Sequence, residues 1–213
     1  MESKKVGIVT IESWNFGNRL QNYALQEILS SLGCSVETFH RLPNQKGIKG
    51  VLKNTLQTVL QSKAAKYKSF DKRIKFSNII LDKDSYPNGI ADSYDFFIAG
   101  SDQVWNPHYR FAAGECDFLA FAPSEKRIAY APSFGVSKIP DEKKDYFAEQ
   151  LSNFAHLSIR EKAGADIIYD LTGRKAEVVL DPTLMLSRQK WESAMRRSKY
   201  IPKQKYVLIY ALG

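Results

Sequence analysis

Short apolar segments rich in β-branched residues alternate in this chain with stretches of helical periodicity, and this alternation restricts the fold most strongly. The first apolar segment covers residues 6–11, and a polar loop separates it from a helical stretch over about residues 19–32. A second apolar segment follows at residues 35–39. A strand, a helix and a strand in this order form a parallel βαβ unit.

The same alternation continues to the end of the chain. Further strands are predicted at residues 95–99, 127–131, 156–159, 177–180 and 206–212, and helices at 141–153, 162–171 and 188–197. Repeated units of this kind predict an α/β fold: a Rossmann-like, mostly parallel sheet with helices on both faces. We expect residues 1–203 to form one domain. Residues 204–213, which follow the Pro202 linker, then read as the first strand of a truncated second domain.

A basic segment interrupts the alternation. Nine lysines and arginines occur between Lys46 and Lys75 against one acidic residue, Asp71, and apolar residues recur there at helical spacing. We expect one or two amphipathic helices, inserted at about residues 46–78. Two interpretations stay open: a solvated helical face, or a contact with a membrane surface or an anionic polymer.

The overall composition is that of a globular protein with an anionic partner. The net charge is +8, which favours a phosphorylated substrate, an acidic glycan, a membrane surface or a nucleic acid. No nucleic-acid motif accompanies this charge, so we expect no nucleic-acid partner. The chain has no apolar run long enough to span a membrane and opens without a signal-peptide pattern, which predicts a cytoplasmic location. The two cysteines, Cys34 and Cys116, lack metal-site spacing, and we expect no metal.

Polar and small residues gather where the predicted strands end. The strand at 95–99 leads into Gly100, Ser101 and Asp102, with Trp105 shortly after. In open α/β sheets, ligands bind at the carboxyl ends of the strands. Gly100 allows a sharp turn or a close approach to a ligand. The alternative is a simple turn into a helix, with Ser101 or Asp102 as its N-cap.

The loop after the first strand has a similar character. Asn15, Gly17 and Asn18 precede or open the first helix, whose N–H groups and positive dipole end favour an anion or a hydroxyl. The loop is not the glycine-rich dinucleotide fingerprint, so a nicotinamide cofactor is not indicated. Asn18 is alternatively a plain N-cap. Asp181 and Pro182 likewise form a sound helix start.

Four motifs at strand ends together resemble the polysaccharide pyruvyl transferase family. They are Asn15-Phe-Gly-Asn-Arg-Leu-Gln-Asn-Tyr-Ala-Leu25, Gly100-Ser-Asp-Gln-Val-Trp-Asn-Pro107, Ser158-Ile-Arg-Glu161 and Leu180-Asp-Pro-Thr183. The resemblance implies one half of a two-domain architecture like that of GT-B glycosyltransferases, this chain being the acceptor side. It also implies an enzyme that transfers the carboxyvinyl unit of phosphoenolpyruvate to two sugar hydroxyls, giving a pyruvate ketal and phosphate. Phosphoenolpyruvate is the donor substrate, a saccharide is the acceptor, and no further cofactor is implied.

The resemblance also suggests roles for individual residues. Arg160 would bind the carboxylate or phosphate of the donor, and Asp102 would orient or deprotonate an acceptor hydroxyl; these two are the predicted catalytic residues. Trp105 or Trp14 would stack on a sugar face. The predicted substrate-binding residues are Asn15, Gly17, Asn18, Gly100, Ser101, Trp105, Ser133 and Glu161.

Two other functions fit the same pattern. One is half of a GT-B-type glycosyltransferase that uses a nucleotide sugar. The other is a non-catalytic module that binds a glycan or a protein partner, because the fold alone does not determine function.

Overall fold

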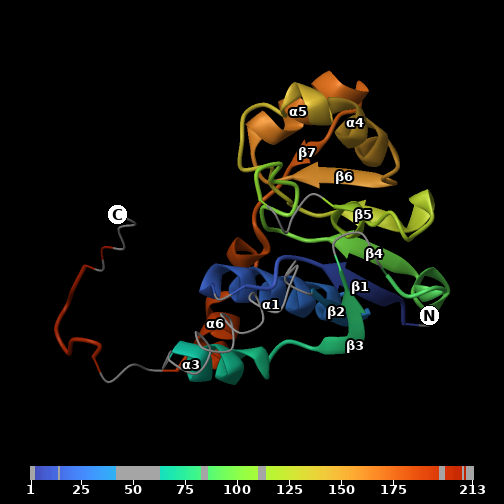
Figure 1. The fold of residues 1–213 in the computed structure, drawn as a ribbon. Helices are drawn as coiled ribbons and strands as arrows, with labels where there is room; N and C mark the ends of the chain where they lie inside the picture. The colour runs from blue at the N-terminus through green and yellow to red at the C-terminus, as the bar shows by residue number, and fades with distance from the viewer. Residues whose placement is uncertain are drawn as a thin grey trace, which may run out of the picture.

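One parallel sheet organises the chain in the computed structural model, which describes residues 3–13, 15–41, 63–82, 86–109, 114–196, 200–207 and 209. Within these residues seven strands follow the order β3-β2-β1-β4-β5-β6-β7 (Figure 1). The strands are β1 Lys5–Val9, β2 Ser35–Arg41, β3 Phe76–Leu81, β4 Phe96–Ala99, β5 Arg127–Ala129, β6 His156–Ile159 and β7 Glu177–Val178. All six pairings are parallel.

Helices join the strands. The α-helices described are α1 Phe16–Ser31, α3 Lys63–Asp71, α4 Lys144–Ser152, α5 Lys162–Thr172 and α6 Arg188–Ala194. Short 3₁₀ turns are η1 Ile90–Ser93, η2 Glu115–Phe118, η3 Ser124–Lys126, η4 Asp141–Lys143 and η5 Pro182–Leu184. Helix α1 starts where the Asn15 side chain accepts a hydrogen bond from Gly17 N at 2.7 Å. Gly33, in the left-handed region with φ of 85°, follows its end.

Apolar side chains fill both faces of the sheet. On one face Val6, Ile8 and Ile98 pack against Leu25 of α1. On the other face a larger cluster joins the sheet to α4 and α5. That cluster includes Phe39, Phe97, Trp105, Phe118, Phe134, Phe147, Leu151, Ile167 and Ile168. The predicted Rossmann-like parallel sheet, with helices on both faces, is therefore confirmed.

The direction of strand addition reverses beside β1. The chain moves from β1 outward to β2 and β3, and then returns to place β4 on the other side of β1. Such a reversal is a topological switch point, where a crevice opens beyond the carboxyl ends of the strands. The fold therefore locates the ligand site before any side chain is considered.

In the region of the predicted basic insertion, the structure differs in part from the predicted helices. Residues 76–78, which we expected to be helical, begin strand β3, whose Ile80 and Leu81 pair with His40 and Arg41 of β2. The helix prediction was wrong here because a run of lysines just before a strand resembles the polar face of a helix. Pairing with β2 decides the actual structure. Of the remainder, α3 is helical as expected, and residues 42–62 lie outside the described residues.

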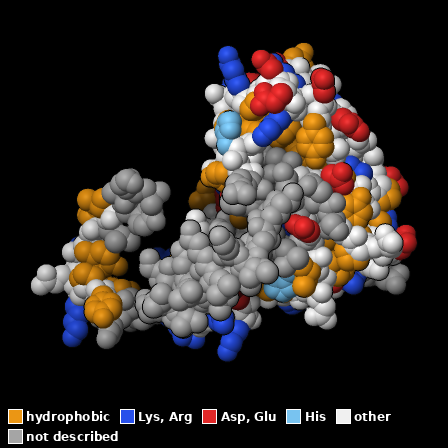
Figure 2. Space-filling view, viewed as in Figure 1, with side chains coloured by type: hydrophobic (Ala, Val, Ile, Leu, Met, Phe, Trp, Pro, Cys, Tyr) orange, Lys and Arg blue, Asp and Glu red, His pale blue; other side chains and the backbone are white. Residues whose placement is uncertain are grey.

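The predicted strand at residues 206–212 is not formed at its described positions. Tyr206, Val207 and Ile209 are 53%, 87% and 82% exposed and belong to no strand. The described residues 200–207 extend away from the body of the molecule (Figure 1), and hydrophobic side chains are visible along this stretch (Figure 2). A strand needs a hydrogen-bonding neighbour, and the seven described strands provide none there. The other residues of this prediction lie outside the described ones.

Candidate functional site

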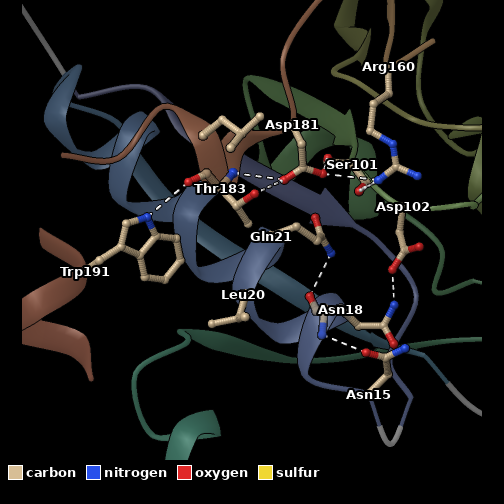
Figure 3. Close-up of a pocket in the computed structure, with 12 residues that line it drawn as sticks. Asn15, Asn18, Leu20, Gln21, Ser101, Asp102, Arg160, Asp181, Thr183 and Trp191 are labelled. Atoms are coloured by element: carbon tan, nitrogen blue, oxygen red, sulfur yellow. Dashed lines mark hydrogen bonds and ion pairs between the residues drawn. The ribbon is translucent and has the colours of Figure 1, made fainter. Parts of the chain in front are cut away.

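A pocket of about 570 Å³ opens at the carboxyl ends of β1, β4, β6 and β7 (Figure 3). Each of these strands ends just before residues that line it. The lining residues are Asn15, Gly17, Asn18, Leu20, Gln21, Ser101, Asp102, Arg160, Asp181, Thr183, Leu184 and Trp191. The parallel sheet thus gathers, at one edge, polar residues that lie far apart in the sequence.

Asp181 connects three of these strand ends. Its Oδ2 accepts hydrogen bonds from Ser101 Oγ at 2.6 Å and from Arg160 Nη1 at 3.2 Å. Its Oδ1 accepts from the backbone N–H and the hydroxyl of Thr183 at 2.9 and 2.7 Å. Burial alone would raise the pKa of Asp181, but these hydrogen bonds together lower it below its usual value. Asp181 is therefore a stable carboxylate.

Asp102 lies across the pocket in a different environment. Its Oδ2 accepts a hydrogen bond from Asn18 Nδ2, and its Oδ1 accepts from the backbone N–H of Gln103 at 2.7 Å. Burial raises the pKa of Asp102 above its usual value; the Gln103 hydrogen bond and the Arg160 charge oppose this, and the charge of Asp181 adds to it. The hydrogen bond from Asn18 fixes the orientation of this carboxyl group.

The two carboxyl groups are thus tuned in opposite directions. A pair of titratable groups whose environments shift their pKa values apart is typical of acid and base roles in one site. Asp181 suits a fixed electrostatic role. Asp102 suits a group that gives and takes a proton.

Arg160 brings a positive charge to the same pocket. Its Nη1 donates to the carbonyl oxygen of Ser101 at 3.2 Å as well as to Asp181, and its Nε lies 3.8 Å from Glu161 Oε2. The hydrogen bonds among the described residues are thus made by Nη1, and Nη2 makes none with them. A planar guanidinium with free N–H donors binds carboxylates and phosphates well.

The structure brings six of the ten predicted site residues together on the pocket wall. They are Asn15, Gly17, Asn18, Ser101, Asp102 and Arg160. Their proposed roles stay predictions. Gly100 does not line the pocket; a Cβ there would lie 3.4 Å from the side chains of Ile8 and Leu25, between the sheet and α1.

Ser133 and Glu161 lie one layer behind the pocket. Ser133 is buried, and its hydroxyl donates to Glu161 Oε1 at 2.6 Å. Ser133 Oγ in turn accepts from the backbone N–H of Gly135 at 3.0 Å. Because Glu161 is the neighbour of Arg160, this chain of contacts positions the arginine and does not line the pocket itself.

The structure does not place Trp105 in the pocket. Its side chain is fully buried in the core, its Nε1 donates to the carbonyl of Asp117 at 3.0 Å, and its ring stacks on Phe118 with centroids 5.5 Å apart. The turn after β4 directs Ser101 and Asp102 outward and then returns the chain inward. The other candidate for stacking, Trp14, lies outside the described residues.

Sequence reasoning missed four polar contributors to the wall: Gln21, Asp181, Thr183 and Trp191. The Asp-Pro-Thr motif after a predicted strand was a usable signal, but we interpreted Asp181 only as a helix cap. It has that role too, since it accepts from the N–H of Thr183 at the start of η5. Trp191 belongs to α6, and its Nε1 donates to the carbonyl of Thr183 at 3.0 Å. No local sequence pattern predicts this contact between Trp191 and Thr183.

Fold and pocket together define a class: a Rossmann-type α/β protein with an arginine and two carboxyl groups in a pocket at a topological switch point. A family model, Polysaccharide pyruvyl transferase, matches residues 15–213. The chain therefore belongs to the polysaccharide pyruvyl transferase family, a family of transferases, and this membership implies a saccharide acceptor. No curated protein and no solved structure matches the chain. No helix among the described residues has the length and apolar character needed to cross a membrane.

Proposed function

We propose that this chain forms the acceptor-side half of a pyruvyl transferase that acts in the cytoplasm. The donor is phosphoenolpyruvate, and the acceptor is a sugar of a cell-surface polysaccharide or of its precursor. The observation that carries the proposal is that, in a chain of this family, one pocket at the switch point brings Asp102, Asp181 and Arg160 together.

The reaction needs two proton movements. Phosphoenolpyruvate and two sugar hydroxyls give a ketal and hydrogen phosphate. One hydroxyl proton ends on the methylene carbon, which becomes the methyl group, and the other leaves on the phosphate. Two carbon–oxygen bonds form at the central carbon, and its bond to the phosphate oxygen breaks. A group that first takes a hydroxyl proton and later gives one suits this balance.

Asp102 meets that requirement. Its raised pKa makes the carboxyl group a stronger base once ionised, and its fixed hydrogen bond from Asn18 holds it toward the pocket. We expect Asp102 to take the proton from the attacking hydroxyl. Asp181 remains ionised and keeps Arg160 and Ser101 in place.

Arg160 supplies the anion site. Its free guanidinium donors would bind the carboxylate or the phosphate of the donor, and its charge would stabilise the negative charge that develops on the leaving phosphate. A second domain, as the resemblance implies, would add further donor contacts in the GT-B-like arrangement.

The test is a calorimetric titration of phosphoenolpyruvate into the protein and its Arg160→Ala variant. We expect binding to the unchanged protein and at least about a tenfold loss in the variant, because a charge-assisted hydrogen bond contributes about 1.5–3 kcal/mol. Lys162→Ala is the matched control. It removes the same charge two residues away, from a side chain that is 83% exposed and pairs with Asp166.

Equal losses of affinity in both variants would mean that only the overall electrostatic field of the protein matters. This result would contradict a specific role of Arg160. Absence of binding to the unchanged protein would contradict the proposed donor. A titration with nucleotide sugars would then test the glycosyltransferase alternative, and binding of glycans alone would indicate a non-catalytic module.

A further inference from the structure

Gln21, in the second turn of α1, has a buried amide that is only half satisfied. The residue is 3% exposed, and its Nε2 donates to Thr10 Oγ1 and to the carbonyl of Asn18, each at 2.8 Å. Its Oε1 is buried and has no hydrogen-bond partner among the described residues. A buried polar atom without a partner costs about 1–3 kcal/mol, so its retention calls for an explanation.

A second glutamine on the same helix provides an internal comparison. Gln26 is 5% exposed, and its Nε2 also donates to a threonine hydroxyl, Thr38 Oγ1, and to a backbone carbonyl, that of Lys75, at 2.8 and 2.9 Å. Its Oε1, however, accepts from the backbone N–H of Lys75 at 2.9 Å. The two amide groups thus donate hydrogen bonds in the same pattern and differ at the oxygen. The oxygen of Gln26 accepts a hydrogen bond within the protein, and the oxygen of Gln21 accepts none from the described residues.

The orientation of the Gln21 amide follows from its neighbours. The carbonyl oxygen of Asn18 can only accept, so the nitrogen of Gln21 must face it and the oxygen must face the other way. In Figure 3 the oxygen points away from Asn18, on the side where Asp181 and Ser101 lie. Gln21 lines the pocket with these residues. Gln21 therefore directs an unpartnered acceptor toward the pocket side of α1.

Position in the pocket distinguishes this atom from other buried acceptors. Gln150 Oε1 on α4 also lacks a partner among the described residues, but Gln150 does not line the pocket. Of these two glutamines in the described part of the chain, Gln21 is the one whose missing partner lies at the pocket.

The unpartnered oxygen of Gln21 favours one of the two proposed substrates over the other. Phosphoenolpyruvate presents acceptor oxygens, which would repel Gln21 Oε1, whereas a saccharide presents hydroxyl donors. We propose that Gln21 Oε1 accepts a hydrogen bond from a hydroxyl of the acceptor saccharide, and so positions the sugar in the pocket. This rests on the proposed function for the identity of the ligand. It divides the pocket into an anion side at Arg160 and a hydroxyl side at Gln21.

A positioning residue of this kind sets specificity. A site built to hydrogen-bond a hydroxyl rejects an analogue that lacks it, because the buried acceptor is then left unpaired. The sugar hydroxyl that meets Gln21 is not one that reacts. Loss of the hydrogen bond between this hydroxyl and Gln21 would weaken sugar binding and leave the binding of phosphoenolpyruvate unchanged.

The test is a sugar titration followed by NMR of the side-chain amide groups. The probes are methyl β-galactoside, methyl α-glucoside and N-acetylmannosamine, used singly. We expect at least one of them to shift the Nε2–H₂ resonances of Gln21 and to leave those of Gln26 unchanged. Assignment follows from the Gln21→Met and Gln26→Met variants, and the measurement itself uses the unchanged protein.

The same variants provide the affinity test. Gln21→Met should weaken the sugar by about ten- to a hundredfold and keep the affinity for phosphoenolpyruvate. Gln26→Met should lower the thermal stability more and keep the sugar affinity in the folded fraction, because its amide is bonded only within the protein.

The outcomes separate this inference from the proposed function. If phosphoenolpyruvate binds and no sugar shifts the Gln21 resonances, the role of Gln21 is wrong while the donor site stands. If a sugar shifts Gln21 but phosphoenolpyruvate does not bind, the proposed transferase donor is wrong and the saccharide contact stands.

Discussion

At the scale of single residues, Asp102 and Asp181 respond to the same pocket in opposite ways. Burial disfavours the ionised form of both, but Asp181 receives hydrogen bonds from Ser101, Thr183 and Arg160 that more than offset it. Asp102 has fewer compensating donors, and its pKa is raised. The hydrogen-bond donors around each carboxyl group therefore decide the direction of its pKa shift.

This difference predicts opposite pH dependences of stability. The raised pKa of Asp102 means that its contribution to the free energy of unfolding is fully present below its unfolded pKa and is lost as the pH rises through the folded pKa. The lowered pKa of Asp181 means that its contribution is present above its unfolded pKa and is lost as the pH falls through the folded pKa.

Melting temperatures of Asp102→Asn and Asp181→Asn across the acid range check both signs. Relative to the unchanged protein, Asp102→Asn should become more stable as the pH rises from about 4 to 7. Asp181→Asn should become less stable over the same range and reach a deficit of about 1–3 kcal/mol at neutral pH, because charged hydrogen bonds are lost. Parallel curves for the two variants would refute the assignment of opposite pKa shifts.

Strand-end position and the family resemblance together predicted six of the twelve residues that line this site. Ser101, Asp102 and Arg160 were identifiable because polar residues directly after a strand must lie at its carboxyl end. Trp105 was misplaced because an aromatic three residues beyond Asp102 can turn outward or inward, and only its partners Asp117 and Phe118 decide which. The sequence did not single out Gln21, because its proposed role rests on a side-chain oxygen that has no hydrogen-bond partner among the described residues.

At the scale of elements, the position of Arg160 depends on how closely α5 approaches β6. Gly164 lies in α5, and a Cβ there would be 2.6 Å from Ile159 Cγ1 and 3.3 Å from Phe134 Cδ2. Ile159 ends β6 and directly precedes Arg160. The glycine thus lets the helix pack against the strand that presents the arginine.

Gly164→Ala should therefore destabilise the protein, although alanine is the better helix former by about 1 kcal/mol. The steric cost of an added methyl group in a tight contact is about 1–3 kcal/mol. Chemical denaturation measures the balance. Asp170→Ala, on an exposed turn of the same helix, is the control that changes helix propensity alone and should be neutral or slightly stabilising. A gain in stability from Gly164→Ala would show that α5 and β6 are less closely packed.

The elements themselves were largely predictable, because hydrophobic periodicity reports local burial directly. Strand β3 and the described part of the predicted strand at residues 206–212 are the exceptions. The sequence of β3, Phe76-Ser-Asn-Ile-Ile-Leu81, follows a lysine-rich run, and the strand forms by pairing with β2, some forty residues earlier in the chain. Pairing between distant segments leaves no local pattern to read.

At the scale of the whole molecule, charge is unevenly distributed. Acidic and basic side chains intermingle over α4 and α5 (Figure 2), where Lys144 pairs with Asp141 and Lys162 with Asp166. The net charge of +8 therefore reflects excess elsewhere. Lys68, Lys72 and Arg73, at the end of α3 and just after it, are exposed members of the basic segment.

We expect this excess to produce peripheral binding to anionic membranes. The protein should co-sediment with phosphatidylglycerol-containing vesicles, fail to do so with phosphatidylcholine alone, and be released by high salt, because screening removes the attraction between exposed charges. The Lys72→Ala/Arg73→Ala double variant should bind more weakly. Co-sedimentation that does not depend on anionic lipid would favour the simple solvated face.

The strand order also has a consequence for the growing chain. Strand β1 is synthesised first, yet it pairs with β4 as well as with β2. Some 55 residues separate Arg41, where β2 ends, from Phe96, where β4 begins. At a translation rate of about 5–20 residues per second, this gap lasts roughly 3–11 seconds. During that time the edge of β1 that later pairs with β4 has unpaired backbone N–H and C=O groups, so the nascent chain is accessible to chaperones before the switch point forms.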